Sequence, residues 1–138
     1  MSVGLPGGRE IRIVSLPALT ILKLMAWTDR RLSQPGKDAY DLAGILRNCL
    51  DAGNQGRLYA EAAHLLDTPD FDYELAGAWL LGYDMAQLLP KAAKVPVAEI
   101  LVTESDLSGP VELVGDMPIE APRALALLQN LKKEVRHT

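Results

Sequence analysis

Apolar and polar residues alternate over residues 10–14 and then recur at helical spacing over most of the chain. The alternation places Ile11 and Ile13 on one side of a short strand. From Ser15, which can cap a helix, apolar residues recur every three or four positions to about Leu32. Because a strand this short needs a partner for its backbone groups, we expect it to pair with a distant segment or with another chain.

A second helix is predicted over residues 39–52, with Asp38 as its N-cap. The proline and glycine within residues 34–36 favour a turn before it, and Gly53 is placed to end it. Asp41 lies in the first turn, where the helix dipole favours negative charge. Two helices joined by so short a turn should be antiparallel neighbours.

The rest of the chain is also predicted to be mainly helical. Apolar faces with helical period lie at residues 55–66, 73–89 and 119–135. Residues 97–105 are compatible with a helix or a strand, and residues 106–118 resemble a loop with a short extended piece at 111–114. The pattern therefore predicts a mainly α-helical bundle with a minor strand element. We expect the glycine-rich residues 1–9 to be mobile and residues 10–138 to form a single domain.

Two glycines, Gly77 and Gly82, lie inside the apolar helix predicted at residues 73–89. A glycine in a helix interior costs about 1 kcal/mol relative to alanine. Its usual reason is the close approach of another helix or of a ligand, and we expect one of these here.

The composition is that of an ordinary globular protein. The chain has 138 residues, of which 49% are hydrophobic and 23% charged, and it is long enough to bury a core of its own. Its net charge of -4 does not indicate a nucleic-acid partner. The single cysteine, Cys49, cannot form an internal disulfide, and no apolar stretch reaches the about 18 residues of a membrane span. We therefore expect a cytoplasmic protein without a membrane partner.

Candidate chemistry is concentrated between Lys23 and Asp41. Lys23 has apolar neighbours one turn away on either side, so its amine must reach solvent or a negative group. It could neutralise a phosphate, or it could pair with Asp38 or Asp41 across the helix pair. The two aspartates share a helix face and could hold a metal ion or orient a hydroxyl. Equally, they could only cap the helix and place negative charge at its N-terminus, where the helix dipole favours it.

The remaining candidates form no cluster. His64 and His137 stand alone, without the clustering that a metal site needs. Residues 70–72, Asp-Phe-Asp, fit the start of a helix better than a metal site. Cys49 falls on an apolar stripe, which favours a core thiol over a nucleophile. These residues predict no protein-held metal.

Residues 13–31, IVSLPALTILKLMAWTDRR, are followed at 37–46 by KDAYDLAGIL. Together they resemble the later motif of the AbiEii-type nucleotidyltransferases, a family that includes toxins of type IV toxin–antitoxin systems. Residues 74–89, ELAGAWLLGYDMAQLL, are similar to the helical region that follows in bacterial members.

The resemblance implies the C-terminal half of a polymerase-beta-like transferase, which moves a nucleotidyl group from a nucleoside triphosphate with Mg²⁺. By motif position, Asp38 and Asp41 would belong to the catalytic acidic motif. Lys23 would contact the triphosphate, and Arg30 and Lys37 would supply supporting positive charge for substrate binding.

This chain departs from the family at one point. The family's first motif, a Gly-Ser or Gly-Gly turn followed by Asp-x-Asp, normally precedes the segments above, and here only residues 1–9 precede the strand. We therefore expect a nucleotidyltransferase-like protein or fragment that is inactive alone and that self-associates or joins a missing N-terminal half. The alternative is a non-catalytic helical interaction module that could form a homodimer.

Overall fold

The computed structural model describes residues 2–4, 10–12 and 15–137 of the chain. The helices are α1 (Leu16–Arg30), α2 (Pro35–Asn48), α3 (Ala63–Leu66), α4 (Tyr73–Leu88), α5 (Lys91–Glu104), α6 (Glu112–Asp116) and α7 (Ala121–His137). Two 3₁₀ turns, η1 (Leu50–Ala52) and η2 (Gln55–Tyr59), follow α2, and two strands, β1 (Ser2–Gly4) and β2 (Glu10–Arg12), precede α1. The predicted mainly α-helical fold is confirmed.

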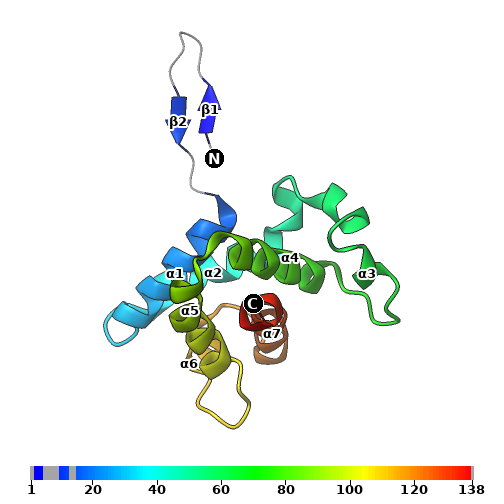
Figure 1. Cartoon of the computed structure of the whole chain (residues 1–138). Helices are drawn as coiled ribbons and strands as arrows, with labels where there is room; N and C mark the ends of the chain where they lie inside the picture. The colour runs from blue at the N-terminus through cyan, green and yellow to red at the C-terminus, as the bar shows by residue number, and fades with distance from the viewer. Residues whose placement is uncertain (1, 5–9, 13–14, 138) are drawn as a thin grey trace.

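The two strands form an antiparallel hairpin in which Val3 lies opposite Ile11. Figure 1 shows this hairpin extending away from the helices. The expectation that residues 10–14 pair with a distant segment or another chain is wrong, because the partner strand lies within residues 1–9. A three-residue strand is too short for alternation to reveal. Residues 13 and 14, and residues 1 and 5–9 of the segment expected to be mobile, lie outside the described residues.

Helix α1 begins as its sequence predicts. The Ser15 hydroxyl oxygen accepts a hydrogen bond from the Ala18 N–H at 3.4 Å, and Pro17 occupies the first turn, where its missing N–H does no harm. Leu24 and Trp27 are buried on the face that meets the core. The cap and this apolar face together fix the position of the helix.

Helix α2 begins at Pro35, earlier than residues 39–52 predict, so Asp38 is not its N-cap. The fixed φ of a proline suits the first helical position, and this preference overrides the capping tendency of the aspartate. Asp38 instead lies inside the helix, fully buried against α1. The regular helix ends at Asn48, and the chain continues through η1 to Gly53, whose φ of 93° is the left-handed conformation that ends the turn.

Other segments also differ from the expectation. Residues 55–66 are not one helix but η2 and α3, and Arg57 of η2 is anchored to the Asp84 carboxylate of α4 at 2.7 Å. Residues 97–105, compatible with a helix or a strand, are helical up to Glu104. The extended piece expected at 111–114 is wrong, because residues 112–116 form α6.

The N-terminus of α6 is held by a residue from another element. The Glu104 carboxylate at the end of α5 accepts a hydrogen bond from the Leu113 N–H at 2.9 Å. A first-turn N–H has no partner within its own helix, so this acceptor stabilises the short helix from outside it. No local pattern in residues 106–118 could have predicted that contact.

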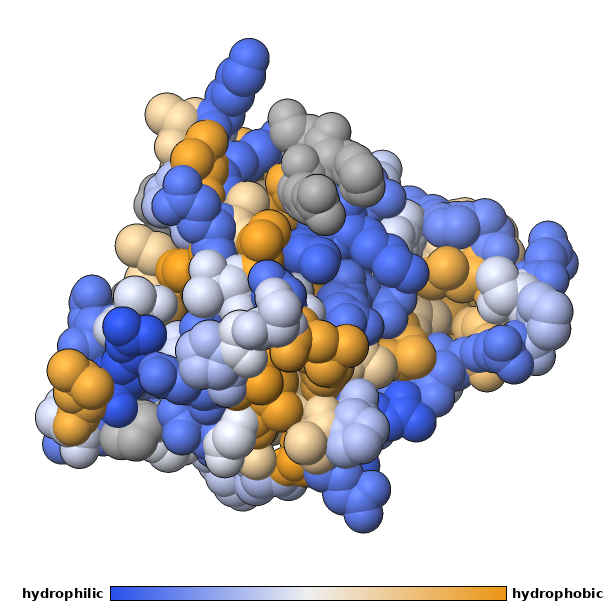
Figure 2. Space-filling view, turned by 90° about the horizontal axis from the view of Figure 1, so that it is seen from below, coloured by the Kyte–Doolittle hydropathy of each residue, from blue (hydrophilic) through white to orange (hydrophobic). Residues whose placement is uncertain are grey.

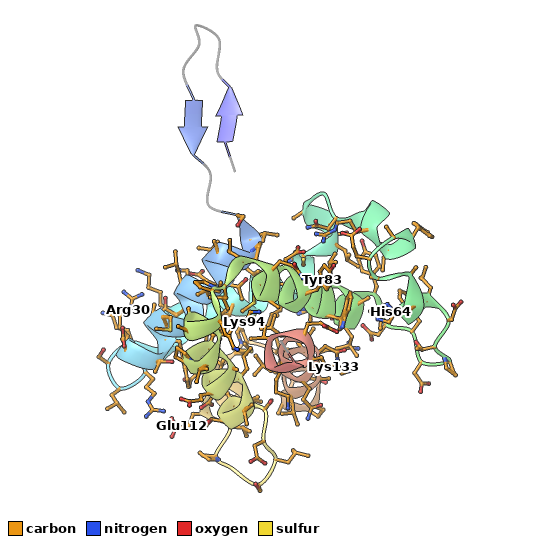
Figure 3. The ribbon with its side chains drawn as sticks, viewed as in Figure 1. Arg30, His64, Tyr83, Lys94, Glu112 and Lys133 are labelled. Carbon is orange, nitrogen blue, oxygen red and sulfur yellow. The ribbon has the colours of Figure 1, made fainter. Side chains whose placement is uncertain are left out.

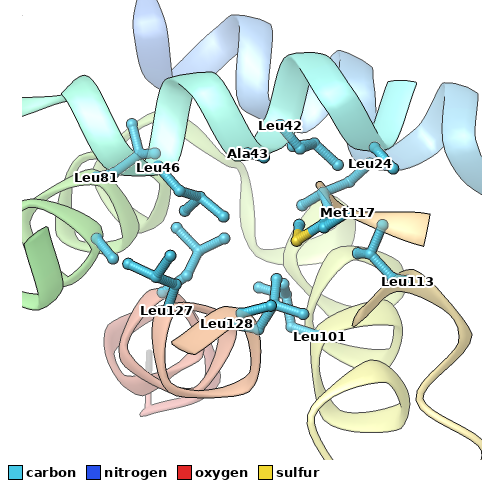
Figure 4. Packing of buried hydrophobic residues seen from close by; sticks show 14 of the residues in the cluster. Leu24, Leu42, Ala43, Leu46, Leu81, Leu101, Leu113, Met117, Leu127 and Leu128 are labelled. Carbon is cyan, nitrogen blue, oxygen red and sulfur yellow. The ribbon is translucent and has the colours of Figure 1, made fainter. Parts of the chain in front are cut away.

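The core lies where α2, α4, α5 and α7 converge. Figure 4 shows leucines from these helices meeting around Met117. Helices α4 and α7 lie in close contact at Gly82, where an added Cβ atom would lie 2.1 Å from the Leu131 carbonyl oxygen. The close helix approach expected from the glycines of α4 is confirmed at Gly82, whereas at Gly77 an added Cβ atom would lie 3.3 Å from the Leu50 side chain of η1.

Apolar side chains also reach the surface in several places. Figure 2, which views the molecule from below, shows such residues between hydrophilic ones. Among the described residues, no helix is both long and apolar enough to cross a bilayer.

Candidate functional site

The structure brings four of the predicted site residues together between α1 and α2. Lys23 and Arg30 come from α1, and Asp38 and Asp41 come from α2; we call these four residues the charge cluster. Lys23 and Arg30 are seven residues apart, about two helical turns, so both reach the same face of α1. Asp38 and Asp41 are three residues apart and face them from α2.

Asp38 is the centre of the charge cluster. Its carboxylate is fully buried and accepts two hydrogen bonds from Arg30, from Nε at 3.1 Å and from Nη2 at 2.9 Å. A buried carboxylate is costly unless it is paired and hydrogen-bonded, and the planar guanidinium meets both of its oxygens. The Lys23 amine lies 3.6 Å from Asp38 Oδ1 and adds a second positive charge.

Lys23 makes its closest contact with the other aspartate. Its Nζ atom lies 2.7 Å from Asp41 Oδ2, and 22% of its side chain is exposed. The hydrogen bond to Asp41 is the largest cause that raises the Lys23 pKa above its ordinary value, and it outweighs the opposing effect of burial. The lysine is therefore held as a cation at the edge of the cluster.

A groove of about 400 Å³ opens beside Lys23, and we call it the α1–α2 groove. Its apolar wall is formed by Leu16, Leu19 and Ile45, and Lys23 and Tyr40 stand at its polar side. This volume falls within the range of small-molecule sites, about 300–1,000 Å³. Tyr40 is 67% exposed, so the ring is open to a ligand in the groove. The groove thus combines an apolar wall, an aromatic ring and the Lys23–Asp41 ion pair, both members of which line it.

The two other polar side chains of this groove, Tyr40 and Asn48, were not predicted. A signal for Asn48 was present, because it lies seven residues after Asp41 and therefore on the same side of α2. Lys37, the fifth predicted site residue, is not brought to the cluster: it is exposed and pairs with no described residue.

The two aspartates do not fit a magnesium site as they stand. Both oxygens of Asp38 accept hydrogen bonds from Arg30, and Asp41 is paired with Lys23. Within residues 2–4, 10–12 and 15–137, no group of three or more His, Cys, Asp or Glu residues is arranged to hold a metal ion. Neither carboxylate is therefore free to bind a divalent cation.

The candidate residues outside the charge cluster make structural contacts. Asp72 caps α4 by accepting the Leu75 N–H at 3.1 Å, which confirms the helix start predicted for residues 70–72. The His64 ring meets the edge of Trp79, with ring centroids 4.6 Å apart. Figure 3 shows His64, in helix α3, on the opposite side of the molecule from Arg30 of the charge cluster.

We expect Cys49 to be chemically inert in the folded protein. It is buried, and burial raises its pKa from 9.0 to about 11. A thiol reagent needs both access and thiolate, so at pH 8 native Cys49 should react at least about 100-fold more slowly than it does in denaturant. Absorbance assays with an aromatic disulfide measure both rates. Equal rates would contradict the core position of the thiol.

The chain was compared with known proteins. No protein-family model, no curated protein and no solved structure matches it.

Proposed function

We propose that this chain is a nucleotidyltransferase-like protein that binds a nucleoside triphosphate in the α1–α2 groove, without catalytic turnover by these residues alone. The observation that supports it is the position of Lys23, whose amine contacts Asp41 and at the same time lines the groove. The sequence resemblance implies that a triphosphate would lie beside this same lysine. Geometry and resemblance thus point to one place on the surface.

The groove offers a nucleotide more than one contact. The Lys23 ammonium is a compact charge that can meet a phosphate oxygen. The exposed Tyr40 ring can stack on a base, because every base has a π-face. The apolar wall of Leu16 and Leu19 excludes water from between these contacts.

Turnover requires more than binding. Nucleotidyl transfer depends on positioned metal ions that neutralise charge on the phosphates. The carboxylates of Asp38 and Asp41 are engaged by Arg30 and Lys23, and the part of the chain that the structure describes contains no cluster of residues able to hold a metal ion. The chain therefore supplies a wall of a nucleotide site and needs further carboxylates for chemistry.

Calorimetric titration with Mg-ATP and Mg-GTP tests this proposal. We expect binding by the wild-type chain and at least about tenfold weaker binding by Lys23→Ala, a loss of about 1.4 kcal/mol. Lys91→Ala removes an exposed lysine at the start of α5 and is the matched control, with unchanged affinity expected. Equal weakening by both variants would mean non-specific attraction, and would contradict the site.

The Lys23→Ala variant should remain folded, which keeps the titration interpretable. Asp38 retains Arg30, and Asp41 is 40% exposed and can be hydrated. We therefore expect the free energy of unfolding to fall by only about 1 kcal/mol. Urea denaturation measures this, and a loss of several kcal/mol would show that Lys23 is mainly structural.

A second candidate function is a non-catalytic helical interaction module. It is favoured because the charged residues of the charge cluster pair with one another. Two cations and two carboxylates satisfy one another, and Asp38 is buried, as expected for residues that only join two helices. This candidate predicts no binding at millimolar nucleotide. A homodimer is a further proposal under either candidate, and sedimentation of the full chain tests it.

A further inference from the structure

Exposed apolar side chains lie on the side of α1 that faces away from the charge cluster. Leu22 and Met25 are exposed at 57% and 41%, and Asp29 follows Met25 after one turn. The spacing of three and four residues places all three on one face of the helix. Lys23 and Arg30 lie on a different face, turned toward α2.

Helix α5 carries a similar exposed stripe. Val95 and Val102 are exposed, and Glu99 lies between them at helical spacing. Pro96, which follows Val95 in the sequence, is exposed as well. Helices of a soluble protein normally turn such apolar positions inward, so an exposed stripe of them indicates an interaction surface.

Part of each stripe lines one groove of about 350 Å³, which we call the α1–α5 groove, whereas Leu22, Val95 and Val102 lie outside its lining. Met25 and Asp29 line it from α1, and Pro96, Glu99 and Ile100 line it from α5. A trough between two helices with apolar side chains at its base fits the apolar face of a third helix. The geometry therefore suits a helix better than an extended peptide, which needs an open strand edge.

The charges at this groove define what it can bind. Asp29 and Glu99 are exposed and pair with no described residue, whereas Arg31, the cation in the lining, is already paired with Glu112 at 3.4 Å. The net unpaired charge of the lining is thus negative. A second copy of the chain docked here by two-fold symmetry would bring Glu99 close to the Glu99 of that copy, and like charges disfavour this contact.

We propose that the α1–α5 groove docks an amphipathic helix of a partner protein, with an apolar stripe flanked by lysine or arginine. Apolar side chains of the partner lie against Met25 and Ile100, and its basic side chains meet Asp29 and Glu99. This interaction goes beyond nucleotide binding and does not depend on it, because none of these residues lines the α1–α2 groove.

Two synthetic helical peptides test the proposal. Both carry leucines at positions i, i+3, i+4 and i+7, and one has lysines and the other glutamates at the flanking positions. Fluorescence anisotropy with the full chain should show at least tenfold tighter binding of the lysine peptide. Weak and equal binding of both peptides, or no binding at millimolar chain, would overturn the proposal.

Charge-reversed variants test whether the peptides bind at the α1–α5 groove. Asp29→Lys with Glu99→Lys should reverse the preference in favour of the glutamate peptide. Asp67→Lys with Asp70→Lys makes the same change in net charge at exposed sites before α4 and should keep the preference for lysine. If the second pair reverses the preference as well, the binding is non-specific attraction and the groove is not the site.

The apolar part of the contact is tested separately. Met25→Ser should weaken both peptides at least fivefold, because it removes an apolar side chain from the groove. Sedimentation of the wild-type chain tests occupation by a second copy. A dimer that Met25→Ser dissociates would assign the groove to self-association and overturn the docking of a partner helix.

Discussion

Replacing Arg30 by alanine should lower the free energy of unfolding by about 3 kcal/mol, although the residue is at the surface. The fully buried Asp38 carboxylate would lose both hydrogen bonds from the guanidinium and keep only Lys23 at 3.6 Å. Removing one partner of a buried pair leaves an uncompensated charge, which costs about 3–5 kcal/mol, and the remaining lysine reduces that cost. Urea denaturation followed by circular dichroism measures the change.

The neighbouring Arg31 provides a close control. Its side chain is 44% exposed, as is that of Arg30, but its partner Glu112 is itself 51% exposed. Arg31→Ala should therefore cost at most about 1 kcal/mol. Adding Asp38→Asn to Arg30→Ala removes the buried charge and should recover part of the loss. Equal effects of the two single arginine variants would contradict the central role of the Asp38 pair.

Replacing Gly82 by alanine should lower the free energy of unfolding by about 3 kcal/mol. The new Cβ atom would lie 2.1 Å from the Leu131 carbonyl oxygen, a backbone atom that cannot rotate away, so α4 and α7 would have to separate. Overpacking of this kind costs about 1–3 kcal/mol or more and outweighs the helix propensity of alanine, about 1 kcal/mol. Thermal unfolding measures the loss.

Gly44 is the matched control for Gly82. It also lies inside a helix, but it is exposed and an added Cβ atom would meet nothing within 4 Å. Gly44→Ala should therefore raise the free energy of unfolding, by up to about 1 kcal/mol. A stabilised Gly82→Ala variant would show that α4 and α7 are not in close contact there.

The regular helices could be predicted from the sequence because their own residues determine them. Ser15 caps α1, and Gly82 marks the close approach of α4 and α7. The predictions were wrong where two residues compete to begin a helix, and where a helix depends on a contact with a residue distant in the sequence. Pro35 rather than Asp38 begins α2, and the carboxylate that supports α6 comes from Glu104.

The candidate site was predictable in part. The pairing of Lys23 with Asp38 and Asp41 was one of the alternatives that the spacing left open, and the structure contains it. The bidentate contact of Arg30 was not predictable, because it depends on how α1 and α2 pack. The exposed position of Tyr40 depends on the same packing.

In the function proposed above, the α1–α2 groove binds a nucleoside triphosphate beside Lys23. The most direct test is an amide ¹⁵N–¹H NMR titration of the labelled chain with Mg-ATP. The claim predicts saturable shift changes at Lys23, Asp41, Gly44 and Asn48, which line the groove, and their loss in Lys23→Ala. Absent changes, or changes confined to other parts of the surface, would contradict it.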